Sequence, residues 1–132
     1  MSFGWAKSGE LSRITLPNPD HLAKLKEGIS AFNQWRNNHP KVKPDLRDAD
    51  LDGADLAGAD LKNAHLRSAV LPEATLFGAD LREAELCRAD FRMADLRGAD
   101  LRKATLLQAR IDVANLQAAL LSQANLYEAV PG

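Results

Sequence analysis

The sequence predicts an all-β solenoid, in which short extended segments and turns wind into stacked coils. The main observation is a five-residue unit that repeats seventeen times between Leu46 and Ala129. Leucine fills the first position of fifteen units, and alanine stands two residues before each new unit begins. Tandem repeats of this regularity indicate a fold built from stacked pieces rather than from one globular core.

A period of five fits neither a regular helix nor a regular strand. Five helical residues turn the chain by about 500°, so successive leucines would lie roughly 140° apart and form no apolar stripe. In a strand, an odd period moves the leucine to the opposite face at every unit. The remaining solution is a short extended piece followed by a bend. Alanine and the next leucine then point to the same side, because they are two residues apart.

The outward positions indicate how many units close one coil. At a spacing of twenty residues, three glycines, three basic residues and three aspartates align in columns: Gly58, Gly78, Gly98; Lys62, Arg82, Arg102; Asp60, Asp80, Asp100. At a spacing of fifteen, a column mixes Lys62, Phe77 and Arg92. The sequence therefore favours four units per coil and just over four coils in all.

The repeated phrase also carries a family resemblance. Residues 53–56 and 98–101 both read Gly-Ala-Asp-Leu, and this Ala-Asp-Leu phrase with two variable residues resembles the pentapeptide-repeat family. The repeat region is expected to occupy residues 46–132, and the resemblance extends over about two-thirds of the chain. It implies a right-handed quadrilateral parallel β-helix with four units per coil. It implies little about function, because most members have no known activity.

The segment before the repeats, residues 1–45, is expected to contain one helix. Residues 1–10 show no deciding period and are expected to be irregular. Asn18 can cap the free N–H groups of a helix, and the proline that follows it suits the first helical position. The helix is expected to end near Asn38, before His39 and Pro40. The sequence therefore predicts one α-helix over about residues 19–38.

This helix is predicted to cap the first coil. Apolar residues recur along it at spacings of three and four: Leu22, Leu25, Ile29, Phe32 and Trp35. The residues expected to cover the coil are Leu25, Ile29, Phe32 and Trp35. An uncovered edge would leave backbone groups unpaired and recruit other chains. Residues 31–40 also resemble the helical leader of some bacterial family members. The alternative is a helix that binds a partner or a membrane surface. The segment contains few of the basic residues that would favour this alternative.

Composition and charge exclude several classes of protein. The formal net charge of −1 favours neither a nucleic-acid binder nor a strongly acidic mimic. The single cysteine, Cys87, excludes an internal disulfide. The N-terminus lacks the apolar run of a secretory signal, and no stretch is long enough to span a membrane. A cytoplasmic protein that binds no membrane is expected.

Catalytic, metal-binding and cofactor-binding motifs are not found in the sequence. The three histidines, His21, His39 and His65, form no metal-ligand spacing with the single cysteine. No nucleophile motif or phosphate-binding loop occurs. The repeat directs its aspartates and glutamates to water, whereas general acid catalysis needs a carboxyl group with a pKa raised by burial. No enzymatic activity and no cofactor are therefore expected.

The last part of the repeats differs sharply in charge. Residues 46–105 contain twenty-one charged residues, whereas 106–132 contain three. Outward positions near this end carry apolar side chains instead, namely Leu107, Val113, Leu120, Tyr127 and Val130. Such a cluster beside an uncapped edge predicts a contact surface. Two copies related by a two-fold axis would bury both edges. The alternative is that these residues fold the final coil over its own end.

Two functions are consistent with these features. The first is a structural or protein-interaction module whose faces or ends bind another protein, including through the aligned charged columns. The columns themselves are expected to offset each other's charge on a solvated face, and docking of a protein partner there is the alternative. The second function follows from the resemblance, since some family members imitate duplex DNA and protect type II topoisomerases such as gyrase. Such mimicry needs a long, strongly acidic surface. The repeats are only roughly 20 Å long at ~4.8 Å per coil, and they contain ten basic residues. The interaction module is therefore preferred.

Overall fold

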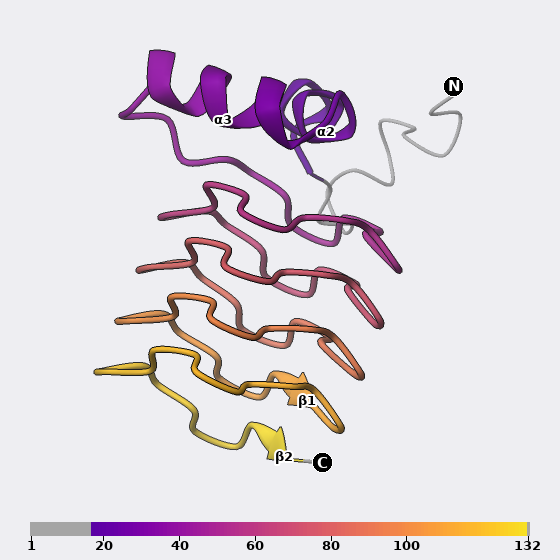
Figure 1. Cartoon of the computed structure of the whole chain (residues 1–132), viewed down its shortest axis with the longest axis vertical. Helices are drawn as coiled ribbons and strands as arrows, with labels where there is room; N and C mark the ends of the chain where they lie inside the picture. The colour runs from indigo at the N-terminus through magenta and orange to yellow at the C-terminus, as the bar shows by residue number, and fades with distance from the viewer. Residues whose placement is uncertain (1–16, 132) are drawn as a thin grey trace, which may run out of the picture.

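A stack of coils follows two N-terminal helices. The computed structural model describes residues 17–131, so the irregular segment expected at residues 1–10 lies outside the described part. The helices are α2 (Pro19–Lys26) and α3 (Ile29–Asn38), and the strands are β1 (Arg110–Ile111) and β2 (Val130–Pro131). The helices lie at one end of the stack, and β2 lies at the other end (Figure 1).

Parallel backbone pairing joins each coil to the next at a spacing of twenty residues. One column of paired residues runs down the stack through Asp45, His65, Glu85, Thr105 and Asn125. Strands β1 and β2 continue the same register, with Arg110 opposite Val130. Each coil therefore contains twenty residues, or four units. Most pairings are isolated bridges rather than long strands, because the chain bends within every unit.

A tight turn in every unit produces these bends. The third residue of all seventeen units has a positive φ, between 56° and 71°. In each unit the alanine N–H donates to the first-position carbonyl, as from Ala54 to Leu51 at 3.0 Å. A positive φ at the third of four residues is the pattern of a type II turn. Glycine adopts this conformation freely, which explains the glycine column that includes Gly58 and Gly78.

The interior consists of the first-position residues and the alanines. From Leu46 to Ala109 these side chains are buried, except for Ala54, which is partly exposed. Phe91, one of the two first-position residues that are not leucine, is fully buried among them. This arrangement confirms that alanine and the following leucine face the same side of the chain.

The single helix predicted over residues 19–38 is wrong, because the chain forms two helices there. The predicted start holds, since the Asn18 side chain accepts hydrogen bonds from the first turn of α2. Gly28 separates the helices with φ 116° and ψ 160°, a conformation that L side chains rarely adopt. The break changes the chain direction, so that α3 lies across the end of the stack while α2 is seen nearly end-on (Figure 1).

The interior assignment predicts the effect of enlarging one alanine. Ala94 is buried between first-position residues, so Ala94→Leu is expected to overpack the coil and cost about 1 to 3 kcal/mol of unfolding free energy. Chemical denaturation measures this change. Ala57→Leu, at a half-buried wall position, is the matched control and is expected to cost much less. A larger loss for the control would contradict the assignment of the faces.

Candidate protein-interaction site

The two ends of the solenoid are built differently, and the N-terminal end is covered. Leu25 and Phe32 are buried, and Ile29 and Trp35 are partly buried and packed against the core. These are the four residues that the sequence places in the cap. The structure therefore brings their apolar side chains together over the first coil, as Figure 1 shows for the helices that carry them.

Polar side chains of α3 bind backbone groups of the first coil that, in later coils, face the coil before. Asn33 Nδ2 donates to the Gly58 carbonyl at 3.0 Å, and Asn33 Oδ1 accepts from the Asp60 N–H at 2.8 Å. Arg36, which is only 6% exposed, donates through Nε to the Asp60 carbonyl at 3.1 Å. Its two terminal nitrogens donate to the carbonyls of Val42 and Lys62. Side chains of α3 thus pair with one part of the backbone edge of the first coil.

Helix α2 contributes a second set of edge contacts. The Asp45 N–H donates to His21 Nδ1 at 2.9 Å, and the Asn18 N–H donates to the Asp45 carbonyl at 3.0 Å. The sequence analysis missed His21, Asn33 and Arg36. One signal was present: Arg36 lies four residues after Phe32, on the apolar side of the helix, where a polar residue requires buried partners.

The His21 contact predicts a pH dependence of the cap. Burial lowers the pKa of His21, although the carboxylates of Asp45 and Asp20 oppose this effect and Arg36 supports it. When His21 is neutral, its Nδ1 accepts a hydrogen bond from the Asp45 N–H. When His21 is protonated, Nδ1 carries a hydrogen and is itself a donor, so it cannot accept from the Asp45 N–H. A lowered folded-state pKa gives stability that is present above about pH 6.5 and is lost as the pH falls through the folded-state value.

The unfolding free energy is therefore expected to fall more between pH 7.5 and pH 5 in the parent than in His21→Asn. Asparagine places an amide oxygen near the position of Nδ1, so it keeps an acceptor but does not titrate. Denaturant titrations at both pH values measure the difference. Because the other histidines are unchanged, subtraction of the two profiles isolates His21. Parallel profiles for the two proteins would contradict the role of this contact.

The side walls carry aspartate–arginine pairs within the repeat. The carboxylate of Asp100 accepts from Arg102 Nε at 2.8 Å and from Nη2 at 2.6 Å, and also from the Arg102 backbone N–H at 3.2 Å. The same arrangement occurs at four other sites: Asp45 with Arg47, Asp80 with Arg82, Asp90 with Arg92 and Asp95 with Arg97. The hydrogen bonds from Arg102 hold the pKa of Asp100 below its usual value. Five wall carboxylates are thus each paired with an arginine two residues away.

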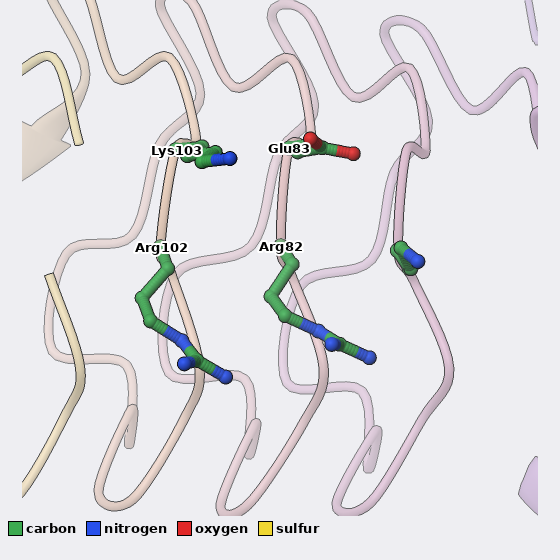
Figure 2. A pocket seen from close by; sticks show the side chains of 5 residues that line it. Arg82, Glu83, Arg102 and Lys103 are labelled. Atoms are coloured by element: carbon green, nitrogen blue, oxygen red, sulfur yellow. The ribbon is translucent and has the colours of Figure 1, made fainter. Parts of the chain in front are cut away.

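A shallow hollow on one wall lies beside these pairs. It has a volume of about 230 Å³ and is lined by Lys62, Arg82, Glu83, Arg102 and Lys103. The side chains of Arg82 and Arg102 run nearly parallel to each other (Figure 2). Both arginines are already bound to aspartates, at 2.6 Å in each case. The two arginines beside the hollow therefore already have carboxylate partners on the same wall.

Comparison with family models decides the identity of the repeats. The model for pentapeptide repeats, eight copies long, matches residues 45–82 and 79–112. These matches extend over more than half of the chain. The chain belongs to the pentapeptide-repeat family.

Solved pentapeptide-repeat proteins resemble this one over part of their length. One from the thylakoid lumen of Arabidopsis thaliana is 29% identical over 60% of this chain and 62% of its own, with a TM-score of 0.44. One from the cyanobacterium Cyanothece is 34% identical over 64% and 62%, with a TM-score of 0.39. HetL of Nostoc, a protein involved in regulating heterocyst differentiation, is 28% identical over 64% and 60%, with a TM-score of 0.36. This chain therefore covers less than two thirds of each. A comparison with curated proteins finds no match.

Within residues 17–131, no three His, Cys, Asp or Glu side chains lie close enough together to hold a metal ion. Neither described helix is long and apolar enough to cross a membrane.

The C-terminal end of the pentapeptide-repeat stack is open. First-position residues of the last coil, including Leu116, Leu121 and Leu126, are partly or largely exposed, although their equivalents in earlier coils are buried. No described segment lies beyond this coil, and the stack ends at β2 (Figure 1). The sequence analysis missed these leucines as contact residues, because the repeat pattern assigns every first position to the interior.

The backbone of the last coil also lacks partners. In the coil before it, the Leu101 and Lys103 N–H groups donate to the carbonyls of Leu120 and Ser122, at 2.8 and 3.0 Å. The equivalent N–H groups of the last coil, on Leu116, Ala118, Leu121 and Gln123, have no acceptor among residues 17–131. The edge therefore presents free donors to the solvent.

The predicted interface residues lie around the rim of this open end. Val113, Leu120, Tyr127 and Val130 are 71%, 48%, 66% and 42% exposed, whereas Leu107 is half-buried one coil earlier. Val113, Leu120 and Tyr127 belong to different units and so lie on different sides of the coil. The four residues of the last coil therefore form a rim rather than one compact patch, and the partly exposed leucines lie inside it.

Val113 combines exposure with backbone strain. Its φ is 57°, and a β-branched residue is disfavoured in this left-handed region by roughly 1 to 2 kcal/mol. Because the side chain is exposed, burial within this chain does not offset the strain. A similar φ recurs at the third position of every unit, so the strain at Val113 comes from the turn of the repeat.

Replacing Val113 with glycine is therefore expected to stabilise the protein in dilute solution by about 1 kcal/mol. Thermal denaturation measures the change. Ala118→Gly is the control, because Ala118 has a similar φ of 63° without a branched side chain, and its effect is expected to be smaller. A lower melting temperature for Val113→Gly would show that the valine packs favourably within its own chain.

Proposed function

We propose that this protein is a non-enzymatic protein-interaction module, a rigid solenoid whose open C-terminal end binds another protein. The observation that carries the proposal is the contrast between the two ends. At the N-terminal end, α2 and α3 cover the first coil, and side chains of Asn33, Arg36 and His21 pair with part of its backbone edge. At the C-terminal end, the equivalent edge, its interior leucines and its apolar rim remain accessible.

The chemistry of the open end suits a protein partner. An unpaired edge can extend its backbone hydrogen bonding onto another chain, a common mode of recognition. Cores of protein interfaces are depleted of charge and enriched in aromatic residues. The last coil, residues 111–130, carries two charged residues, Asp112 and Glu128, and its rim includes Tyr127.

Mimicry of DNA toward a type II topoisomerase is the weaker alternative. It requires a continuous acidic surface, whereas several of the wall aspartates, such as Asp90 and Asp95, are bound by arginines of the same repeat. A supercoiling assay with gyrase separates the two functions, since an interaction module is expected to leave gyrase unaffected at micromolar concentration. The proposed compartment is the cytoplasm, although one solved relative comes from a thylakoid lumen.

Site-specific cross-linking in the native host tests where the partner binds. A photo-reactive phenylalanine at position 127 is expected to form adducts with protein, because Tyr127 lies on the exposed rim. The matched control places the same group at position 77, where Phe77 is similarly exposed but lies on a wall. Adducts should appear at 127 and not at 77. Equal labelling at both positions, or none at 127, would contradict binding through the open end.

A further inference from the structure

We propose that the N-terminal end of the solenoid carries a second binding surface, which takes up a basic peptide segment of another protein as an added strand. The surface is the part of the first coil at residues 47–57, called here the N-terminal edge. The inference goes beyond the proposed function, because it concerns the opposite end of the stack. It rests on unpaired backbone groups, on the acidic side chains beside them and on one partly exposed alanine.

The first coil has four sides, and the segment that contains the helices pairs with two of them. His21 and the backbone before α2 bind the side centred on Asp45, and side chains of α3 bind the side centred on Asp60. The N–H and carbonyl groups of Asp50 and Asp55 have no hydrogen-bond partner among residues 17–131. Both of these residues are exposed, whereas Asp45 and Asp60 are half-buried. Two sides are therefore accessible.

Later coils show how the backbone groups of the N-terminal edge are directed. On the side centred on Asp55, one coil further on, the Thr75 N–H donates to the Ala54 carbonyl at 2.9 Å. The Thr75 carbonyl accepts from the Leu56 N–H at 2.7 Å. Thr75 thus directs both groups toward the coil before it. Asp55 occupies the equivalent position of the first coil, so its N–H and carbonyl point away from the stack and can pair with an added strand.

The N-terminal edge is electronegative. The carbonyls of Asp52 and Ala57 also lack a donor among residues 17–131, so acceptors outnumber donors along the edge. The second positions of these two units hold aspartate and alanine, where five other units hold the arginine that binds an aspartate. Four exposed aspartates consequently form no ion pair with a described residue: Asp48, Asp50, Asp52 and Asp55. A cationic peptide is the complementary partner.

The exposed alanine indicates which side chains alternate in that peptide. Successive side chains of a strand point to opposite faces. A peptide residue that bridges to Asp55 directs its side chain outward, where lysine or arginine lies about 5 Å from the aspartate in the same column. The neighbouring peptide residues point inward. Ala54 is partly exposed there, although the other alanines of the interior from Ala49 to Ala109 are buried. Basic residues that alternate with small apolar ones therefore fit the edge.

The helices limit what can reach the N-terminal edge. Both α2 and α3 stand on this end of the stack (Figure 1), so the flat end of another solenoid cannot lie against the first coil. A single added strand needs only the spacing between neighbouring strands, about 4.8 Å. Addition of an extended peptide to an exposed sheet edge is a recurring mode of recognition, in which main-chain hydrogen bonds give affinity and alternate side chains give specificity.

Titration of the full chain with a ten-residue peptide of alternating lysine and valine, followed by amide NMR, tests the proposal. The amide signal of Asp55 is expected to shift, and its exchange with water is expected to slow, because the N–H gains an acceptor. A peptide with glutamate in place of every lysine is the matched control and is expected to leave this signal unchanged. An unchanged Asp55 signal with the lysine peptide at millimolar concentration would overturn the proposal.

Two substitutions of Asp55 separate the charge from the backbone donor. Asp55→Asn keeps the N–H and is expected to weaken binding of the lysine peptide about two- to fivefold. Asp55→Pro also removes the N–H, a change that edge positions tolerate, and is expected to weaken binding about tenfold or more. Glu83→Gln removes an exposed carboxylate from another side of the stack and is expected to bind like the parent. A folded proline variant that binds as well as the asparagine variant would show that the backbone edge is not used.

The parent protein without peptide distinguishes the other occupants and needs no variant to fold. The Asp50 and Asp55 amides are expected to exchange freely at every protein concentration. Protection that rises with protein concentration would assign the N-terminal edge to a second copy, and protection at every concentration would assign it to residues 1–16 of the same chain. Either result would overturn the proposal. Cross-linking at position 127 tests the C-terminal end separately, so the proposed function can stand or fail independently of this edge.

Discussion

Each coil can satisfy its backbone only by pairing with another coil. The hydrogen bonds between coils run along the solenoid axis and join successive coils of twenty residues, as from the Leu81 N–H to the Asp100 carbonyl at 2.8 Å. Inner coils therefore find partners above and below, while both terminal coils face an unmet requirement. At the N-terminal end, α2 and α3 meet part of it with His21, Asn33 and Arg36. At the C-terminal end, no described residue meets it.

The turn geometry adds a second constraint, which the sequence satisfies only in part. Every unit needs a positive φ at its third residue, but glycine occupies four of the seventeen positions, at 53, 58, 78 and 98. The other positions adopt the left-handed conformation at some cost in free energy. Inter-coil hydrogen bonds and the buried leucine and alanine layers hold them there. Val113 stands at a turn where burial does not compensate, because it lies on the exposed last coil.

Charge is arranged so that the walls are polar and the open end is nearly neutral. An aspartate and an arginine two residues apart bind each other on the outside of a coil, which limits the field of the acidic columns. The sequence analysis expected opposite columns to offset each other. The structure shows that the main pairing joins neighbouring units, as between Asp80 and Arg82, with a longer contact of 3.7 Å from Arg82 to Asp100 in the next coil.

The sequence by itself determined the repeat, the four units per coil, the interior positions and the start of the helical segment, because each follows from local spacing. It could not determine that Gly28 divides the helix, since helical spacing of apolar residues continues across that position. Nor could it show that His21, Asn33 and Arg36 bind the first coil, or that Leu116, Leu121 and Leu126 are exposed. These properties depend on which coil lies at an end. The five-residue pattern is the same in inner and terminal coils. Only the tertiary structure distinguishes a coil with neighbours on both sides from a coil at an end.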